Sequence, residues 1–168
     1  TRPSRVDNLS MPSLREVIHQ THETLEASEI ADARLEAEVM VMNVMQMPRQ
    51  GLVAQQEMEV SRQQQEVLNE ILDRRRKREP LAYILGHKEF YGVDLLVNSD
   101  VLIPRPESET LVEHALFMSL MGMEVAQLVI ADVGTGTGAI AINLGLHLPA
   151  ARIYATDISE KALMVANF

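Results

Sequence analysis

The chain of 168 residues contains no cysteine and no tryptophan, and aromatic residues account for only 4% of it. The lack of cysteine excludes disulfides and thiolate zinc sites, and it is compatible with a reducing cytoplasm, where we expect the protein to work. No apolar run approaches the length of a membrane span, and nothing near the start resembles a secretory signal peptide. We therefore expect a soluble protein that has no membrane partner.

Positive charge is also scarce, because 15 lysines and arginines stand against 24 aspartates and glutamates, which gives a formal net charge of -9. Affinity for nucleic acids depends on cationic contacts to phosphate, so this balance argues against direct binding of DNA or RNA. A protein or small-molecule substrate fits the charge better. Hydrophobic residues make up 46% of the chain, which is enough for a buried core.

The most informative stretch is 128–157, where an apolar run of strand type ends in a glycine-rich turn. Gly134, Gly136 and Gly138 alternate in this turn, a helical pattern follows, and a second short strand-like run ends at Asp157. This order predicts a β-α-β unit with a nucleotide-type ligand at the carboxyl edge of its strands.

The alternating glycines remove side chains where the backbone turns, and they let a ligand approach the main chain. A tight turn without a ligand would need only one glycine, so we favour a ligand site. Asp157 is placed like the acid that grips ribose hydroxyls in such units. A ribose is therefore the group that we expect it to hold.

Two ligands compete for this turn. The glycines and Ala139 can be fitted to the dinucleotide fingerprint G-x-G-x-x-G/A, with Asp157 near the expected distance, and that interpretation predicts NAD. The pattern Asp-x-Gly-x-Gly-x-Gly, which starts at Asp132, resembles instead the first motif of class I S-adenosylmethionine-dependent methyltransferases. That resemblance implies adenosylmethionine as the cofactor, whereas the glycine spacing alone leaves the choice open.

Before residue 80 the pattern is helical. Ser13 and Glu16 have the form of a capping box, and the segment from Ser61 to Gln64 looks like a second cap. The apolar positions after these caps recur at helical spacing: Leu14, Val17, Ile18, Thr21 and Leu25, then Val67, Leu68, Ile71 and Leu72. A bundle of three or more helices is the expectation for residues 1–80.

Between these two helices, Asp32 is expected to cap another helix, which Pro48-Arg-Gln-Gly51 breaks. The predicted apolar stripe of that helix consists of Leu35, Val39, Met42 and Met45, widened by Met40 and Met47. Methionines at this spacing are expected to be core rather than a partner-binding surface. The run Arg74-Arg-Arg-Lys-Arg78 could grip RNA or a ribosome-associated partner, but we favour a solvated helix end, because cations suit a helix carboxyl terminus.

From residue 80 onward short β-type runs appear. Residues 81–86 and 87–97 suggest two strands about a glycine turn, so 81–102 is predicted to be a hairpin linker. Pro104 and Pro106 then fix an extended segment and start a helix that runs to about Met121. That helix is expected to pack through Leu111, Val112, Ala115 and Leu116.

Three segments in this order resemble the HemK/PrmC family, the methyltransferases that modify the glutamine of the Gly-Gly-Gln motif in peptide-chain release factors. They are Arg-Glu-Pro-Leu-Ala-Tyr-Ile-Leu-Gly (78–86), Ile-Pro-Arg-Pro-Glu-Ser-Glu (103–109) and Asp-Val-Gly-Thr-Gly-Thr-Gly-Ala-Ile-Ala (132–141). The resemblance implies an α/β fold class, with an all-α helical bundle followed by a partial Rossmann-like class I methyltransferase domain. Residues 1–80 would then help to recognise the protein substrate, and 103–168 would be the first part of the methyltransferase domain.

The same resemblance implies which residues bind adenosylmethionine: Gly134, Thr135, Gly136, Thr137 and Gly138 would line it, and Asp157 would hold its ribose. Asp132 would orient the glycine loop or accept a hydrogen bond near the methionine moiety. Arg105 and Glu107 lie in a segment similar to the family loop that closes over the pocket, although Glu107 also suits the positive start of a helix. We expect no metal site, because no set of histidines and carboxylates completes a metal pattern.

The sequence departs from the family in one respect, because family members continue to an Asn-Pro-Pro-Tyr motif that it does not contain. We therefore expect the catalytic groups beyond Phe168, and we expect the 168-residue chain alone not to catalyse. The strand near 128–133 would lie mid-sheet in the intact fold, so its open edge is expected to promote self-association.

Three alternatives stay open at this point. An adenine-directed DNA methyltransferase would use a similar Asn-Pro-Pro-Tyr motif, although the acidic charge and the helical front domain disfavour it. An oxidoreductase would bind NAD in the same turn. A non-enzymatic docking module would use only the helical bundle to bind a release factor.

Overall fold

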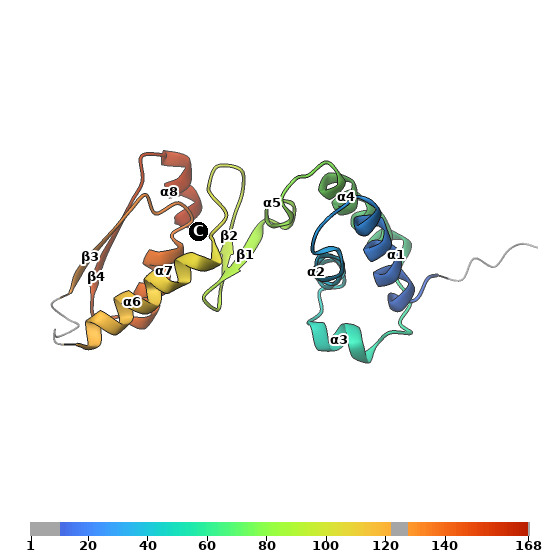
Figure 1. The fold of residues 1–168 in the computed structure, drawn as a ribbon, viewed down its shortest axis with the longest axis horizontal. Helices are drawn as coiled ribbons and strands as arrows, with labels where there is room; N and C mark the ends of the chain where they lie inside the picture. The colour runs from blue at the N-terminus through green and yellow to red at the C-terminus, as the bar shows by residue number, and fades with distance from the viewer. Residues whose placement is uncertain (1–10, 122–127, 168) are drawn as a thin grey trace, which may run out of the picture. The chain divides into compact units, whose positions relative to one another are not determined.

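A computed structural model describes residues 11–121 and 128–167. The chain divides into two compact units, Thr1–Leu85 and Gly86–Phe168, and each is described by itself (Figure 1). The segment 81–102 is therefore divided between the two units. Within the described ranges, no helix is both long enough and apolar enough to cross a lipid bilayer.

The first unit is built from helices. They are α1 (Leu14–Ala27), α2 (Ala33–Met45), α3 (Arg49–Ala54), α4 (Arg62–Arg76) and α5 (Leu81–Leu85). Its core comes mainly from α1, α2 and α4, and the apolar positions predicted for α1 and α4 are buried or half-buried, except Val67, which is exposed. The predicted helices at both ends of this unit are confirmed.

Both predicted capping boxes are present. At the start of α1 the Ser13 hydroxyl accepts from the Glu16 backbone N–H at 3.3 Å, and a Glu16 carboxylate oxygen accepts from the Ser13 N–H at 2.8 Å. Ser61 and Gln64 make the same reciprocal pair at the start of α4, at 3.3 and 2.9 Å. Each pair satisfies two amides that the first helical turn would leave without partners.

The predicted apolar stripe of α2 is confirmed in part, because Met40 and Met45 are buried and Met42 and Met47 pack against the core. Leu35 is 56% exposed, and the residues that α2 buries are Ala33, Ala37, Met40, Val41 and Met45. Helix α2 packs against α1, α3, α4 and α5. Asp32 stands at the predicted cap position, but its side chain accepts no capping hydrogen bond.

The segment after α2 is also more helical than predicted. Pro48 is the N-cap of α3, so Gly51 lies inside a short helix rather than in a break. Proline suits this position because it has no backbone N–H. The first N–H groups of a helix have no acceptor within the helix, so nothing is lost there. The chain therefore bends between Met45 and Pro48 and becomes helical again.

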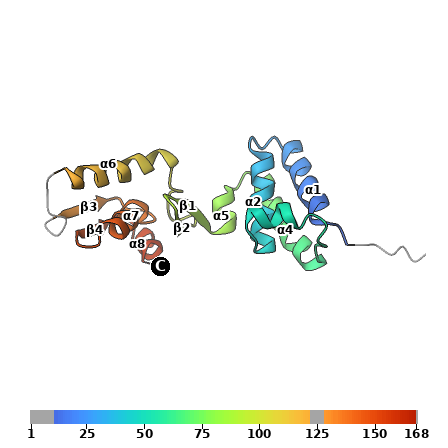
Figure 2. The ribbon, with the colours of Figure 1, turned by 90° about the horizontal axis from the view of Figure 1, so that it is seen from below.

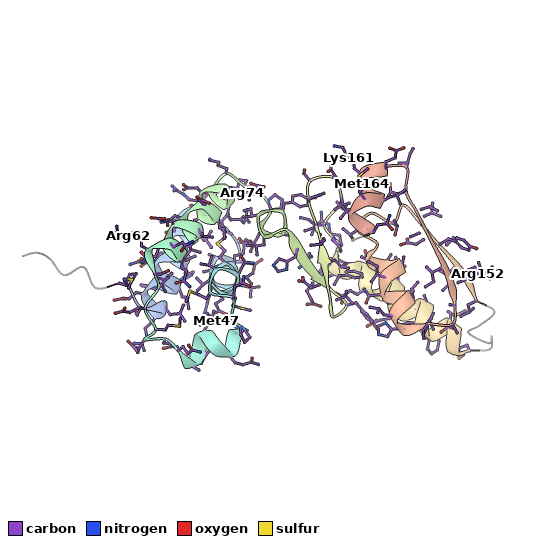
Figure 3. The ribbon with its side chains drawn as sticks, turned by 180° about the vertical axis from the view of Figure 1, so that it is seen from behind. Met47, Arg62, Arg74, Arg152, Lys161 and Met164 are labelled. Atoms are coloured by element: carbon purple, nitrogen blue, oxygen red, sulfur yellow. The ribbon has the colours of Figure 1, made fainter. Side chains whose placement is uncertain are left out.

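The basic run at the end of α4 is used within the unit and is not simply solvated. The guanidinium of Arg75 donates two hydrogen bonds to the Glu36 carboxylate, at 2.6 and 3.1 Å, and both side chains are largely buried. Arg74 pairs with Glu79, and Arg78 donates to the Glu29 carbonyl at 3.1 Å. Figure 3 shows Arg62 and Arg74 on α4.

The Arg75 pair should be a measurable part of the stability of this unit. We expect Arg75→Ala to lower the free energy of unfolding by about 1–3 kcal/mol, because Glu36 on α2 would remain as a largely buried carboxylate without its donors. Urea unfolding followed by far-UV circular dichroism measures the loss. The matched control is Arg76→Ala, which removes an exposed arginine 3.5 Å from Asp73 and should change stability by less than about 0.5 kcal/mol. Equal losses in the two variants would contradict this account.

The second unit begins with an antiparallel hairpin, β1 (His87–Phe90) and β2 (Val93–Leu96). Its turn residues Tyr91 and Gly92 both have positive φ, as a two-residue hairpin turn of type I′ requires. The hairpin was predicted one segment too early, because residues 81–85 form the helix α5 and not a strand. The amides of Tyr83 and Ile84 donate to the Pro80 carbonyl at 3.0 and 3.2 Å, which closes that helical turn.

The rest of the second unit contains the predicted β-α-β unit. After η1 (Pro106–Ser108) and α6 (Glu109–Leu120), the chain forms β3 (Val129–Val133), α7 (Ala139–His147), β4 (Arg152–Thr156) and α8 (Glu160–Ala166). Strands β3 and β4 pair in parallel, with Val129 opposite Arg152 and Val133 opposite Thr156. The β-α-β prediction is confirmed; a larger Rossmann-like sheet stays a prediction.

Helices α6 and α7 lie side by side (Figure 2). Val112 of α6 is fully buried and Ala115 and Leu116 are half-buried, as predicted, but Leu111 is 59% exposed, so that part of the prediction is wrong. The hairpin is tied to both helices. A Glu109 carboxylate oxygen accepts from the Tyr91 N–H at 3.0 Å, and the Asn143 amide donates to the Phe90 carbonyl at 3.4 Å.

One face of the β3–β4 pair is open within the described residues. Side chains alternate along β3, so Ile130 packs on the core while Val129 and Val133 are exposed on the other face, as is Tyr154 of β4. An apolar face of this kind needs another layer to cover it. Self-association through this region stays a prediction.

Candidate functional site

The glycine loop connects β3 to α7 and is fastened to the end of β4. The amides of Gly134 and Thr135 both donate to the Thr156 carbonyl, at 2.8 and 2.9 Å. Further along the loop, the Gly138 amide donates to the Thr135 carbonyl at 2.8 Å. The loop therefore lies at the carboxyl ends of two parallel strands, which is the edge where α/β proteins bind ligands.

All three glycines of the loop have left-handed backbones, with φ of +79° at Gly134, +56° at Gly136 and +78° at Gly138. Other residues adopt this region only with strain. A Cβ placed on Gly134 or Gly136 would meet no heavy atom within 4 Å. The space beside the backbone is thus open at these two positions, so a ligand could approach the main chain there.

Gly138 has a different role. A Cβ on it would lie 2.9 Å from Cδ1 of Ile142 and 3.3 Å from Cβ of Ala166. The glycine lets the start of α7 pack closely against its own next turn and against α8. It is therefore required for packing as well as for its backbone conformation.

Asp132, at the end of β3, holds the loop from behind. One of its carboxylate oxygens accepts from the Thr135 hydroxyl at 2.7 Å and from the Ala141 amide at 3.2 Å. Ala141 is the third residue of α7, whose N-cap Gly138 has no side chain to do this. Asp132 thus caps α7 from a distance and places a negative charge at the positive end of the helix. Thr135 and Thr137 are both buried.

Asp157, just after β4, faces the loop from the other strand. One carboxylate oxygen accepts from the Gly136 amide and the other from the Ser159 amide, both at 2.9 Å. These two amides, Ser159 first and Gly136 second, hold the pKa of Asp157 below its ordinary value. An ionised carboxylate offers about four lone-pair positions, so it can accept further hydrogen bonds from a ligand's hydroxyls.

The lowered pKa of Asp157 gives a pH prediction with a definite sign. Its folded-state pKa lies below the ordinary value of 3.8, so its contribution to stability is complete above pH 3.8 and is lost as the pH falls through the lowered value. Carbon-13 NMR of the side-chain carboxyl should therefore give a titration midpoint below 3.8. A midpoint at or above that value would mean that the two backbone hydrogen bonds do not persist in solution.

The structure brings most of the predicted site residues together, but not Arg105. Asp132, Thr135, Gly136 and Asp157 are linked by the hydrogen bonds described above. Arg105 is the exposed N-cap of η1, and among the described residues no hydrogen bond or ion pair joins its side chain to the loop. Its place in the pocket wall stays a prediction, as does that of Glu107.

The site combines two carboxylates with an open stretch of backbone. Asp132 and Asp157 face the loop, and Gly134 and Gly136 leave room for a group beside the main chain. At the start of α7 the Ala141 amide already donates to the Asp132 carboxylate. These features are compatible with a ligand whose hydroxyl groups donate to a carboxylate.

The chain is similar to known methyltransferases. Residues 16–86 match a family described as PrmC N-terminal domain. The chain is 46% identical to a release factor glutamine methyltransferase of Coxiella burnetii over 134 residues, and 40% identical to one of Koribacter versatilis over 155 residues. These matches cover 80% and 92% of the chain, and 47% and 54% of the relatives.

A third relative carries a broader name. The chain is 32% identical, over 179 aligned residues and 92% of its own length, to a bifunctional methyltransferase of Rickettsia felis, of which the match covers 34%. The chain thus spans about half the length, or less, of these relatives.

Proposed function

We propose that this chain, which is similar to the HemK/PrmC family of methyltransferases, belongs to that family and forms part of an enzyme that methylates peptide-chain release factors. The methyl group would come from S-adenosylmethionine and would be transferred to the side-chain amide nitrogen of the glutamine in the Gly-Gly-Gln motif. The helical unit would help to recognise the release factor, and the second unit would bind the cofactor.

One observation carries the cofactor assignment. Gly134 and Gly136 have left-handed backbones with open space where a side chain would be, while Asp132 and Asp157 hold the loop in place. This open backbone lies at the carboxyl ends of the parallel strands β3 and β4, the edge where α/β proteins bind ligands. The names of the matched relatives support a methyl donor rather than NAD.

Each residue of the site has a proposed role. The cofactor supplies an activated methyl group on a sulfonium. Asp157 would accept hydrogen bonds from the ribose hydroxyls with its unused lone pairs, since its other ones are taken by Gly136 and Ser159. Asp132 is a positioning residue that keeps Thr135 and the loop backbone in place. Gly134 and Gly136 would let the cofactor lie against the main chain.

We assign no catalytic residue in this chain. A neutral amide nitrogen is a weak nucleophile, so the enzyme must hold it in line with the methyl group and accept hydrogen bonds from its protons. Asp132 and Asp157 are already given other roles, since Asp132 holds the loop and Asp157 would hold the ribose. In the family the Asn-Pro-Pro-Tyr motif would take that role.

The proposal is tested by mass spectrometry of a release factor incubated with the full-length protein and labelled adenosylmethionine. We expect one label, on the glutamine of the Gly-Gly-Gln motif. The control is a release factor in which that glutamine is replaced by glutamate, which should remain unlabelled. A label on another residue, or none on the wild-type release factor, would rule out the proposed substrate.

A further inference from the structure

The first unit contains a groove of about 810 Å³ that has no role in the cofactor site. Residues of α1, of the first half of α2 and of most of α3 line it. Its apolar surface comes from Ile18, Leu52 and Val53, and Val53 is 68% exposed. The volume falls within the range of about 300–1,000 Å³ that is usual for ligand sites.

Arginines are the main charged residues that line this groove, and carboxylates pair with all three. The chain has a net charge of -9, yet the charged residues that line the groove include three arginines and one glutamate. Arg34 and Arg49 both approach the Glu38 carboxylate, at 3.8 and 2.8 Å. Arg15 pairs with Glu57 instead. All three arginine side chains are mostly exposed, so they remain accessible to a partner.

The arginines stand at two separate ends of the groove. Arg15 lies in the first turn of α1, next to the segment after α3, because it also donates to the Gln56 side chain at 3.2 Å. Arg34 and Arg49 lie toward the other end of α1, where they line a neighbouring cavity together with His22 but without Arg15. Seven helical residues separate Arg15 from His22, which corresponds to about 10 Å along α1.

This arrangement suits an extended partner with two acidic groups. A single phosphate would need the cations to converge on one point, whereas here they are separated by an apolar surface. Each arginine already pairs with a carboxylate of the chain, so a carboxylate of a partner could bind in the same way. Carboxylates at positions i and i+7 of a helix lie on the same face about two turns apart, with apolar side chains between them.

We propose that this groove docks an acidic amphipathic segment of the protein substrate. Apolar side chains of the segment would pack on Leu52 and Val53, and its carboxylates would face Arg15 at one end and Arg34 and Arg49 at the other. The inference rests on the proposed function, because it takes the release factor as the partner. It adds the surface of the helical unit that binds the partner and the kind of segment that is bound.

Steady-state methylation of an intact release factor by the full-length protein tests the groove. Val53→Asp and Arg34→Glu should each raise KM for the release factor about tenfold and leave kcat unchanged, because the groove binds the substrate without touching the reacting atoms. The matched controls lie outside the groove, on α4: Val67→Asp at another exposed valine and Arg62→Glu at another first-turn arginine. Both controls should keep KM within about twofold of the wild type.

The outcomes separate the groove from the proposed function. If the wild-type protein does not methylate the release factor, the proposed function fails and the groove inference fails with it. If it does, and the groove variants show the same KM as the controls, the groove inference alone is wrong. Both groove substitutions are at exposed side chains, and circular dichroism checks that each variant is folded; the more exposed Arg34→Glu decides the result if Val53→Asp does not fold.

Discussion

Replacement of Gly138 by alanine is expected to lower the free energy of unfolding of the second unit by about 2–4 kcal/mol. Two costs combine at this position. The left-handed backbone, with φ of +78°, strains any residue that has a Cβ, and the new methyl group would lie 2.9 Å from Ile142 and 3.3 Å from Ala166. Urea unfolding, with hydrogen exchange of the α7 amides to localise the loss, measures the effect.

Gly86 provides the matched control for Gly138. Its backbone has φ of +82°, and a Cβ on it would meet no heavy atom within 4 Å. Gly86→Ala should therefore show only the cost of the backbone, about 1–2 kcal/mol. If the two variants lost the same stability, the close contact of α7 with α8 at Gly138 would not matter, and our account of that glycine would be wrong.

Asp157→Asn is expected to weaken adenosylmethionine binding by the full-length protein by about 10- to 100-fold. Asparagine has one acceptor oxygen, while Asp157 uses one oxygen for Gly136 and the other for Ser159. The NH2 group of the asparagine would replace one of the two oxygens. It would therefore face either a backbone N–H or a ribose hydroxyl as a donor, and one hydrogen bond to an acceptor would be lost. Isothermal titration calorimetry gives the affinity.

The control for Asp157 is another acid of the same unit. Asp100 pairs with Lys161 of α8 at 3.1 Å and makes no described contact with the glycine loop. Asp100→Asn changes the net charge by the same amount as Asp157→Asn. It should nevertheless leave the affinity within about twofold of the wild type, because only the net charge and no contact with the loop changes. An unchanged affinity in Asp157→Asn would remove Asp157 from the cofactor site, and with it the main support for the proposed donor.

Local chemistry made part of this fold predictable from sequence. The capping boxes at Ser13 and Ser61 depend on residues three positions apart, so their geometry is independent of the rest of the chain. The same holds for the glycine turn after β3, because the residue types that a left-handed backbone tolerates are few. Asp132 was predicted to orient the loop, and its hydrogen bonds to Thr135 and Ala141 are of the kind that would do so.

The buried face of α2 could not be predicted in the same way. The helix is apolar on several sides, so its sequence pattern does not single out one face. The choice is made by the helices that pack around α2, which bury Ala33 and Ala37 together with Met40 and leave Leu35 exposed.

The error at 81–85 has a local cause that could have been found. Leu-Ala-Tyr-Ile-Leu has the composition of a strand, but Pro80 precedes it and Gly86 follows it. Proline at the start and glycine with positive φ at the end are the usual limits of a short helix. The roles of Glu109 and Asn143 had no such signal, because both side chains bond to the β1–β2 hairpin, which lies far from them in sequence.

The hydrogen bonds at the end of β4 join the glycine loop to the acid that faces it. The Thr156 carbonyl accepts from the first two amides of the glycine loop, and the next residue, Asp157, accepts from the amide of Gly136. These bonds couple the loop to Asp157, so part of the entropy of ordering both is lost when the chain folds. For the proposed cofactor the contacts would then be preorganised, so a larger share of their free energy would become affinity.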